Sequence, residues 1–346
     1  MFSRLVFTTL LLVYFLVFVG AFVRSVGAGM GCPDWPKCFD QWVPPTSAEQ
    51  LPDNYQEILR NKRVAKSLRF AKVLSALGME GKAKIIEEYS THKAEGVELF
   101  NSTKTWVEYI NRLVGVFVGF FIFFCLVASY KFRRTQPKVF WLSLLTFILV
   151  GFQGWLGSLV VATNLFPGLI SFHMFIAMLI ALLLIYLYFI SKGYQTNTKE
   201  ASPIQKRVRG LLLVSVLLLL VQVIMGTNVR EQIDVIAKAF EYQNREGWIA
   251  QLNTLFFTHR SFSILILLIQ LAILWFVKKY ISHPIAYFLM LSFILLEVGI
   301  GAVMAYFAIP AALQPIHLLV GVGLVGVQYW FFLLSGCKFA GDFKKQ

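Results

Sequence analysis

Eight long apolar runs dominate this sequence of 346 residues. A helix needs roughly 20 apolar residues to cross the hydrocarbon core of a bilayer, and such runs are rare in soluble domains. The sequence therefore predicts an all-α polytopic membrane protein with eight transmembrane helices, near residues 5–28, 109–130, 140–163, 168–190, 210–228, 256–277, 285–308 and 313–336.

Composition and charge agree with this class. The chain is 58% apolar and only 14% charged, which excludes an ordinary soluble protein. Most of the formal net charge of +14 lies at the termini and in the loops at 131–138, 192–209 and 278–279, whereas the loops at 30–107 and 231–255 are nearly balanced or acidic. By the positive-inside rule we expect an inner (cytoplasmic) membrane protein, N-in and C-in, whose outer loops face the periplasm or exterior. This sidedness accounts for the basic charge, so we expect no nucleic-acid partner.

The two halves of the chain repeat one pattern of small and polar residues. The segment 20–24 ends the first run with Gly-Ala-Phe-Val-Arg, and the segment 226–230 ends the fifth with Gly-Thr-Asn-Val-Arg. The other matched positions are Asn111-Arg112 with His259-Arg260, and Gln153, Gly157 and His173 with Glu297, Gly301 and His317. We therefore expect two duplicated four-helix bundles, residues 1–200 with the long outer loop, and residues 201–346.

Histidines lie at these matched positions near the outer helix ends. His259 and His317 come from the second and fourth helices of the C-terminal half, a placement that suits two axial imidazole ligands of a haem. The N-terminal half has His173 but Asn111 where the second imidazole would lie. Helix–helix hydrogen bonding or another metal remains the alternative for these side chains.

Four arginines lie at the same outer ends, namely Arg24, Arg112, Arg230 and Arg260. Arginine forms bidentate pairs with carboxylates, so these residues are candidates for binding haem propionates. For Arg24 and Arg230, contact with lipid phosphates is an equal alternative.

Two acidic residues lie within an apolar run or directly before one. Glu108 lies three positions before Asn111 and so shares its helical face, which makes it a candidate catalytic group. A salt bridge to Arg112 is the structural alternative. Glu297 matches Gln153 and is interpreted as a structural acid.

Two cysteines, Cys32 and Cys38, flank a stiff segment with two prolines and a tryptophan beyond the first run. An outer location permits a disulfide there, either as a structural link or as a pair that cycles between thiol and disulfide. The inserted stretch at about 47–103 has no assigned role, although its part at 53–89 has helical character.

Taken together, these motifs resemble the haem A synthase family, membrane enzymes with eight helices that convert haem O to haem A. The residues that carry the resemblance are Gly31 to Cys38, Trp42 to Pro45, Glu108 to Leu113, Gln153 to Gly157, His173, Thr258 to Arg260 and His317. It covers nearly the whole chain outside the insertion at about 47–103.

The resemblance implies roles for these residues. His259 and His317 would bind haem b as cofactor, His173 would bind the iron of the substrate haem O, and Glu108 would be catalytic. Asn111 departs from the family pattern, in which a histidine stands there, and this would leave one face of the substrate iron open. The reaction would oxidise a ring methyl to formyl for cytochrome oxidase assembly.

The implied partners are membrane lipid and, as supplier of haem O, a haem O synthase. The electron partner is left open. The oligomeric state is also left open, and a homo-oligomer is one of the alternatives. Two other functions compete with this interpretation. One is a di-haem cytochrome b-type electron carrier between quinone and an outer partner, and the other is a transporter with duplicated halves.

Overall fold

The computed structural model describes residues 1–92, 99–166, 168–194, 203–280 and 284–336. Within these residues, eight helices are long and apolar enough to cross a membrane, as predicted. These are α1 (Phe2–Ser25), α4 (Ser102–Ser129), α5 (Pro137–Ala162), α6 (Leu169–Ser191), α7 (Pro203–Ala239), α8 (Thr254–Tyr280), α9 (Pro284–Tyr306) and α10 (Leu313–Leu334).

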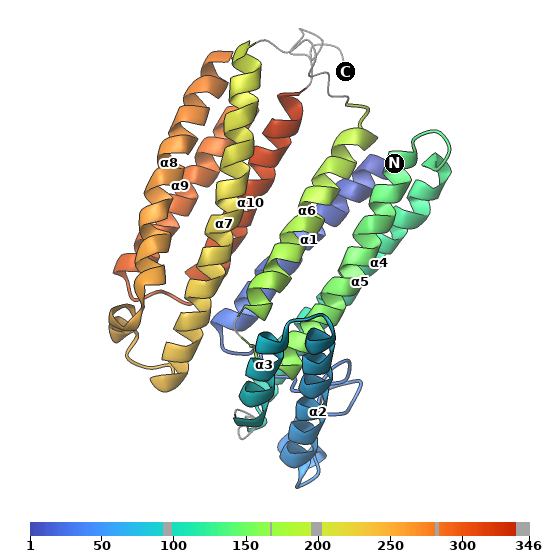
Figure 1. Cartoon of the computed structure of the whole chain (residues 1–346), viewed down its shortest axis with the longest axis vertical. Coiled ribbons are helices and arrows are strands. Elements are labelled where there is room, and N and C mark those ends of the chain that lie inside the picture. Colours follow the sequence, from blue (N-terminus) through green and yellow to red (C-terminus); the bar gives the residue numbers. More distant parts are fainter. Residues whose placement is uncertain (93–98, 167, 195–202, 281–283, 337–346) are drawn as a thin grey trace.

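The spanning helices form two closed rings of contacts (Figure 1). In one ring α1 packs on α4, α4 on α5, α5 on α6 and α6 on α1. In the other, α7 packs on α8, α8 on α9, α9 on α10 and α10 on α7. Helices α4 and α6 are thus opposite one another, as are α8 and α10. The proposed domain boundary at 200/201 lies outside the described residues, and the duplication stays a prediction.

Three helix pairs join the rings, because α10 contacts both α1 and α6, and α6 contacts α7. The helices alternate in direction, so the N-terminus and the end of α10 lie at the same end of the molecule in Figure 1. Large apolar side chains such as Phe120, Trp141, Leu268 and Leu295 are exposed along the spanning helices. Such exposed apolar surface is expected where lipid is the solvent.

The insertion forms two helices, α2 (Tyr55–Ala76) and α3 (Glu80–His92), which confirms its predicted helical character. They pack against each other at the end of the molecule opposite the N-terminus (Figure 1). The Ser67 hydroxyl donates to the Ala162 carbonyl at 2.8 Å, and the ring of Phe70 meets that of Trp155 edge-on. These contacts fix α2 on the end of α5.

Helix α7 is longer than the apolar run predicted. The run ends near residue 228, yet the helix continues to Ala239, into the segment that was expected to be a loop. Val229, Ile233 and Ala237 recur every four residues and bury one face against the segment that follows the helix. An amphipathic face at helical spacing therefore extends α7 beyond its apolar part.

Candidate functional site

Three histidines and one asparagine lie near the starts of four helices. His173 is in the second turn of α6, His259 in the second turn of α8 and His317 in the second turn of α10. Asn111 is in the third turn of α4. All four helices begin at the end of the molecule that carries α2 and α3 (Figure 1).

In the C-terminal ring, a glycine on the neighbouring helix faces each imidazole. A Cβ atom at Gly226 of α7 would lie 3.2 Å from Cε1 of His259. One at Gly301 of α9 would lie 3.3 Å from Cε1 of His317. Both distances are shorter than ordinary van der Waals contacts. The absence of a side chain at these two positions therefore makes room for the rings.

The N-terminal ring repeats this arrangement with looser contacts. A Cβ atom at Gly157 of α5 would lie 3.6 Å from Cε1 of His173, and one at Gly20 of α1 would lie 3.9 Å from Oδ1 of Asn111. The four glycines occupy the positions that the internal repeat pairs. Asn111 thus has the same kind of neighbour as His259, but it carries an amide in place of an imidazole.

Polar side chains next to the histidines bond mainly to the backbone. Gln222 donates from Nε2 to the carbonyl of His259 at 3.0 Å, and Gln153 donates in the same way to His173 at 2.9 Å. The Nδ1 atoms of His173, His259 and His317 are buried and have no hydrogen-bond partner. Buried polar atoms usually have a hydrogen-bond partner, so these imidazole nitrogens are unusual in having none.

The C-terminal histidines fit a haem. They lie on opposite helices of one ring, each against a glycine, so both imidazoles would be available to hold one haem. Within the described residues no three His, Cys, Asp or Glu side chains are grouped to hold a metal ion. A haem iron takes four ligands from the porphyrin and needs only two imidazoles, so this donor set suits haem better than a free ion.

Arg24 and Arg230 meet at Asp234, a residue that the sequence interpretation missed. The Arg24 guanidinium lies 2.5 Å from Oδ2 of this carboxylate, and the Arg230 guanidinium 2.7 Å from Oδ1. Arg230 also donates to the carbonyl of Arg24 at 2.9 Å, which links α7 to α1. The i, i+4 spacing of Arg230 and Asp234 was the available signal in the sequence.

Two arginines thus share one carboxylate, and Nε of Arg24 is buried without a hydrogen-bond partner. The cluster keeps one positive charge in excess. A carboxylate of a ligand could still be bound there. Arg260, in contrast, is exposed, and its guanidinium lies 5.4 Å from the ring centroid of Phe257.

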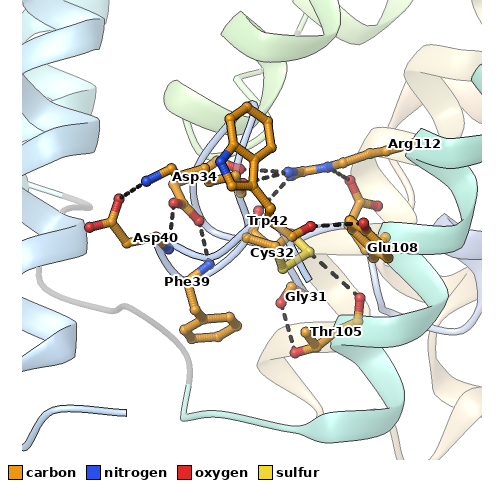
Figure 2. The surroundings of a disulfide bond; sticks show 12 residues. Gly31, Cys32, Asp34, Phe39, Asp40, Trp42, Thr105, Glu108 and Arg112 are labelled. Atoms are coloured by element: carbon orange, nitrogen blue, oxygen red, sulfur yellow. Dashed lines mark hydrogen bonds and ion pairs between the residues drawn. A yellow bond between two sulfur atoms is a disulfide. The ribbon is translucent and has the colours of Figure 1, made fainter. Parts of the chain in front are cut away.

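Arg112 binds the loop that contains the cysteines, as Figure 2 shows. Its guanidinium donates to the backbone carbonyls of Cys32 at 2.8 Å, Asp34 at 2.6 Å and Lys37 at 3.1 Å. Its Nε donates to Oε1 of Glu108 at 3.2 Å. The side chain predicted to bind a propionate is therefore engaged with the loop and with Glu108.

Glu108 is buried, with 6% of its surface exposed, and lies one helical turn before Arg112. The salt bridge considered from the sequence as its structural alternative is thus present. This ion pair and the carbonyl contacts of Arg112 connect Glu108 to the cysteine loop in a single network (Figure 2).

Cys32 and Cys38 form a disulfide, and both are fully buried with 0% exposure. The Asp34 carboxylate accepts hydrogen bonds from the backbone N–H groups of Phe39 at 2.7 Å and Asp40 at 2.8 Å. The bridge and these bonds fix the conformation of the loop, which supports the structural interpretation of the cysteine pair.

A pocket of about 200 Å³ lies between this loop, α2 and the end of α5. Lys62 binds the Asp40 carboxylate at 3.0 Å, and this bond holds the pKa of Asp40 below its usual value. The ammonium of Lys66 lies 5.4 Å from the ring centroid of Trp35. Burial, followed by the nearby charge of Arg112, lowers the pKa of Lys66. The pocket is thus lined by more basic than acidic side chains, namely Lys37, Lys62, Arg63 and Lys66 against Asp34 and Asp40.

Comparisons with known proteins identify the family of the chain. The profile of a family described as cytochrome oxidase assembly protein (COX15-CtaA) matches residues 3–79 and 78–329. Relatives named Heme A synthase, from Bacillus cereus strain AH187 and from Bacillus anthracis, are 24% identical over 197 residues, which is 57% of this chain and 45% of the relative. The match spans about half the length of these relatives, and no solved structure matches the chain. Because the family profile covers nearly all of its length, the chain belongs to the COX15-CtaA family of cytochrome oxidase assembly proteins.

Proposed function

We propose that this protein is a haem A synthase that oxidises a ring methyl of haem O to the formyl group of haem A. The observation that carries the proposal is the pair of imidazoles on opposite helices, each against a glycine, in a chain of this family. Relatives named Heme A synthase support the same reaction.

In this proposal His259 and His317 bind haem b in the C-terminal ring. When bound, haem b supplies one-electron transfer. The protein contributes two imidazoles and an apolar surround that limits water. Arg24 and Arg230 lie at the junction of the two rings, where their excess positive charge favours a propionate.

The substrate haem O would occupy the N-terminal ring with its iron on His173. Asn111 supplies no imidazole from the opposite helix, so one face of the substrate stays open. An open face suits an oxidation in which an oxidant or water must reach the substrate haem. Two imidazoles would instead block both faces of its iron.

Glu108 acts as the proton acceptor in this proposal, and Arg112 sets its position. The disulfide loop holds Arg112 through three carbonyls, so the Cys32–Cys38 bridge contributes by fixing this arrangement. Preorganised charge of this kind needs no rearrangement during the reaction. The cysteines then have a positioning role, in which no thiol takes part.

We further propose that both chain termini are cytoplasmic and that the end with α2 and α3 faces the periplasm or exterior of an inner-membrane protein. The basic loops support this orientation, because their described residues lie at the opposite end. Haem O would come from a haem O synthase, and lipid surrounds the spanning helices.

The proposed function is tested by chromatography of haems extracted from cells that make haem O, with and without this chain. Haem A is expected only when the chain is present. Haem O that accumulates without conversion would contradict the enzyme proposal. The comparisons give no support to a di-haem electron carrier.

The haem b site is tested separately in purified protein. His259→Ala and His317→Ala should each remove the low-spin haem absorbance, because each leaves the iron with one imidazole. Asn111→Ala, at the matching position in the other ring, is the control and should retain it. Unchanged absorbance in both histidine variants would contradict this assignment.

A further inference from the structure

Glu297 is an acidic residue inside an apolar helix, and the proposed reaction does not use it. It is the only charged residue in the sequence of α9. A carboxyl group at such a position costs free energy unless it has a partner or a function. The contacts of Glu297 therefore identify what it does.

The carboxyl group of Glu297 is directed at His317. Oε1 of Glu297 lies 3.3 Å from Nδ1 of His317. Oε2 is buried and has no hydrogen-bond partner. A Cβ atom at Gly321, one turn after His317, would lie 3.0 Å from Oε1. The missing side chain at Gly321 thus leaves space for the carboxyl group beside the imidazole.

The position of Glu297 next to Nδ1 favours one tautomer of the His317 imidazole once the two groups form a hydrogen bond. A proton on Nδ1 faces Glu297, so the lone pair of a neutral ring is on Nε2. An imidazole that binds a metal through one nitrogen commonly donates its other N–H to a carboxylate, which fixes the ring and makes the ligand more basic. Glu297 and His317 are close enough for such a bond, because Oε1 lies 3.3 Å from Nδ1, although the two groups are not oriented as a hydrogen bond in this structure.

The corresponding residue in the other ring behaves differently. Gln153 matches Glu297 in the internal repeat, but its side chain donates to the backbone carbonyl of His173 and not to the imidazole. His259 has Gln222 on its carbonyl in the same manner. Among the three histidines, only His317 has a carboxyl group next to its ring nitrogen.

We propose that Glu297 is a positioning residue that holds His317 with Nε2 toward the iron and lowers the reduction potential of haem b. A more basic, partly anionic ligand stabilises the oxidised iron relative to the reduced iron. Haem b would thereby be a better electron donor than it would be with a neutral partner at this position. This inference rests on the proposed binding of haem b by His259 and His317.

The experiment is a redox titration of haem b absorbance in the full-length protein, purified in detergent. Glu297→Gln keeps an acceptor oxygen but removes the charge. It should raise the midpoint potential by about 59 mV, which corresponds to a tenfold change in a one-electron equilibrium. Glu297→Asp withdraws the carboxyl group by one methylene and should give a smaller rise.

Glu246→Gln is the matched control, because it removes an exposed acidic group of the same half that has no contact with the imidazole. Its potential should equal that of the wild type. The inference is wrong if Glu297→Gln also titrates like the wild type. Loss of haem b from both Glu297 variants contradicts it too, because a residue that only adjusts a ligand is dispensable for binding.

The two proposals fail in distinguishable ways. A wild-type protein without low-spin haem b would contradict the haem b assignment before Glu297 is tested. A normal haem b spectrum with no difference in potential between wild type and Glu297→Gln would contradict only the role of Glu297.

Discussion

Arg24 and Arg230, which end corresponding helices of the two halves, bind the two oxygens of one carboxylate, that of Asp234. A carboxylate from only one half thus binds both arginines of a pair that the internal repeat places in the two halves. The contact joins α1 to α7 across the boundary between the rings.

Asp234→Asn should destabilise this junction, because it removes the charge of the carboxylate that binds both guanidinium groups. We expect a loss of about 2–3 kcal/mol in the free energy of unfolding. Denaturation in detergent measures it, with the exposed Asp53→Asn as control. Equal stability of Asp234→Asn and wild type would show that the shared carboxylate is dispensable.

Gly226→Ala should disturb haem b, because the new Cβ atom lies 3.2 Å from Cε1 of His259 and forces the imidazole to move. We expect about tenfold weaker retention of haem b, as for other changes next to a metal ligand. Gly20→Ala is the matched control, because its Cβ atom makes only an ordinary contact with Asn111. Haem content and visible spectra of both variants test this, and equal retention would contradict it.

Glu108→Gln should reduce haem A formation by about 10²–10⁴-fold while haem b and folding are retained. The amide keeps shape and can still accept the Arg112 hydrogen bond, so only the proton-accepting function is lost. Extracted haems and the visible spectrum report the two effects separately. Glu57→Gln, at an exposed position of α2, is the control. Near-normal haem A formation in Glu108→Gln would mean that Glu108 is only a structural partner of Arg112.

Asn111→His should add a second imidazole opposite His173. The substrate haem is then expected to become six-coordinate and low-spin, and haem A formation should slow because the open face is closed. Asn111→Ala keeps that face open and is the control. If Asn111→His forms haem A as fast as wild type, open access at this position is not required.

Removal of the disulfide should destabilise the outer loop. The bridge closes a short loop, for which chain entropy predicts about 2 kcal/mol. Mass spectrometry of protein isolated without reductant should find Cys32 and Cys38 linked. In a thermal denaturation, reductant should lower the midpoint of wild type but not that of the double variant Cys32→Ser/Cys38→Ser. Two free thiols in the first measurement would contradict the bridge.

The sequence predicted the spanning helices well, because their length and apolar character are local properties. It predicted less well where helices end outside the apolar region. Helix α7 continues to Ala239 because the face made by Val229, Ile233 and Ala237 packs on a later segment. The Arg112 contacts were also hard to foresee, since the three carbonyls come from a loop 75–80 residues earlier.

The sequence by itself determined the eight apolar helices and the pattern of matched glycines, histidines and arginines, because hydropathy and spacing are encoded residue by residue. The tertiary structure decided which side chains meet. Only the packing of helices against one another sets Gly226 beside His259, Asp234 between two arginines and Glu297 next to His317. These contacts depend on the rotation and relative height of each helix, which many weak interactions along the whole interface determine together.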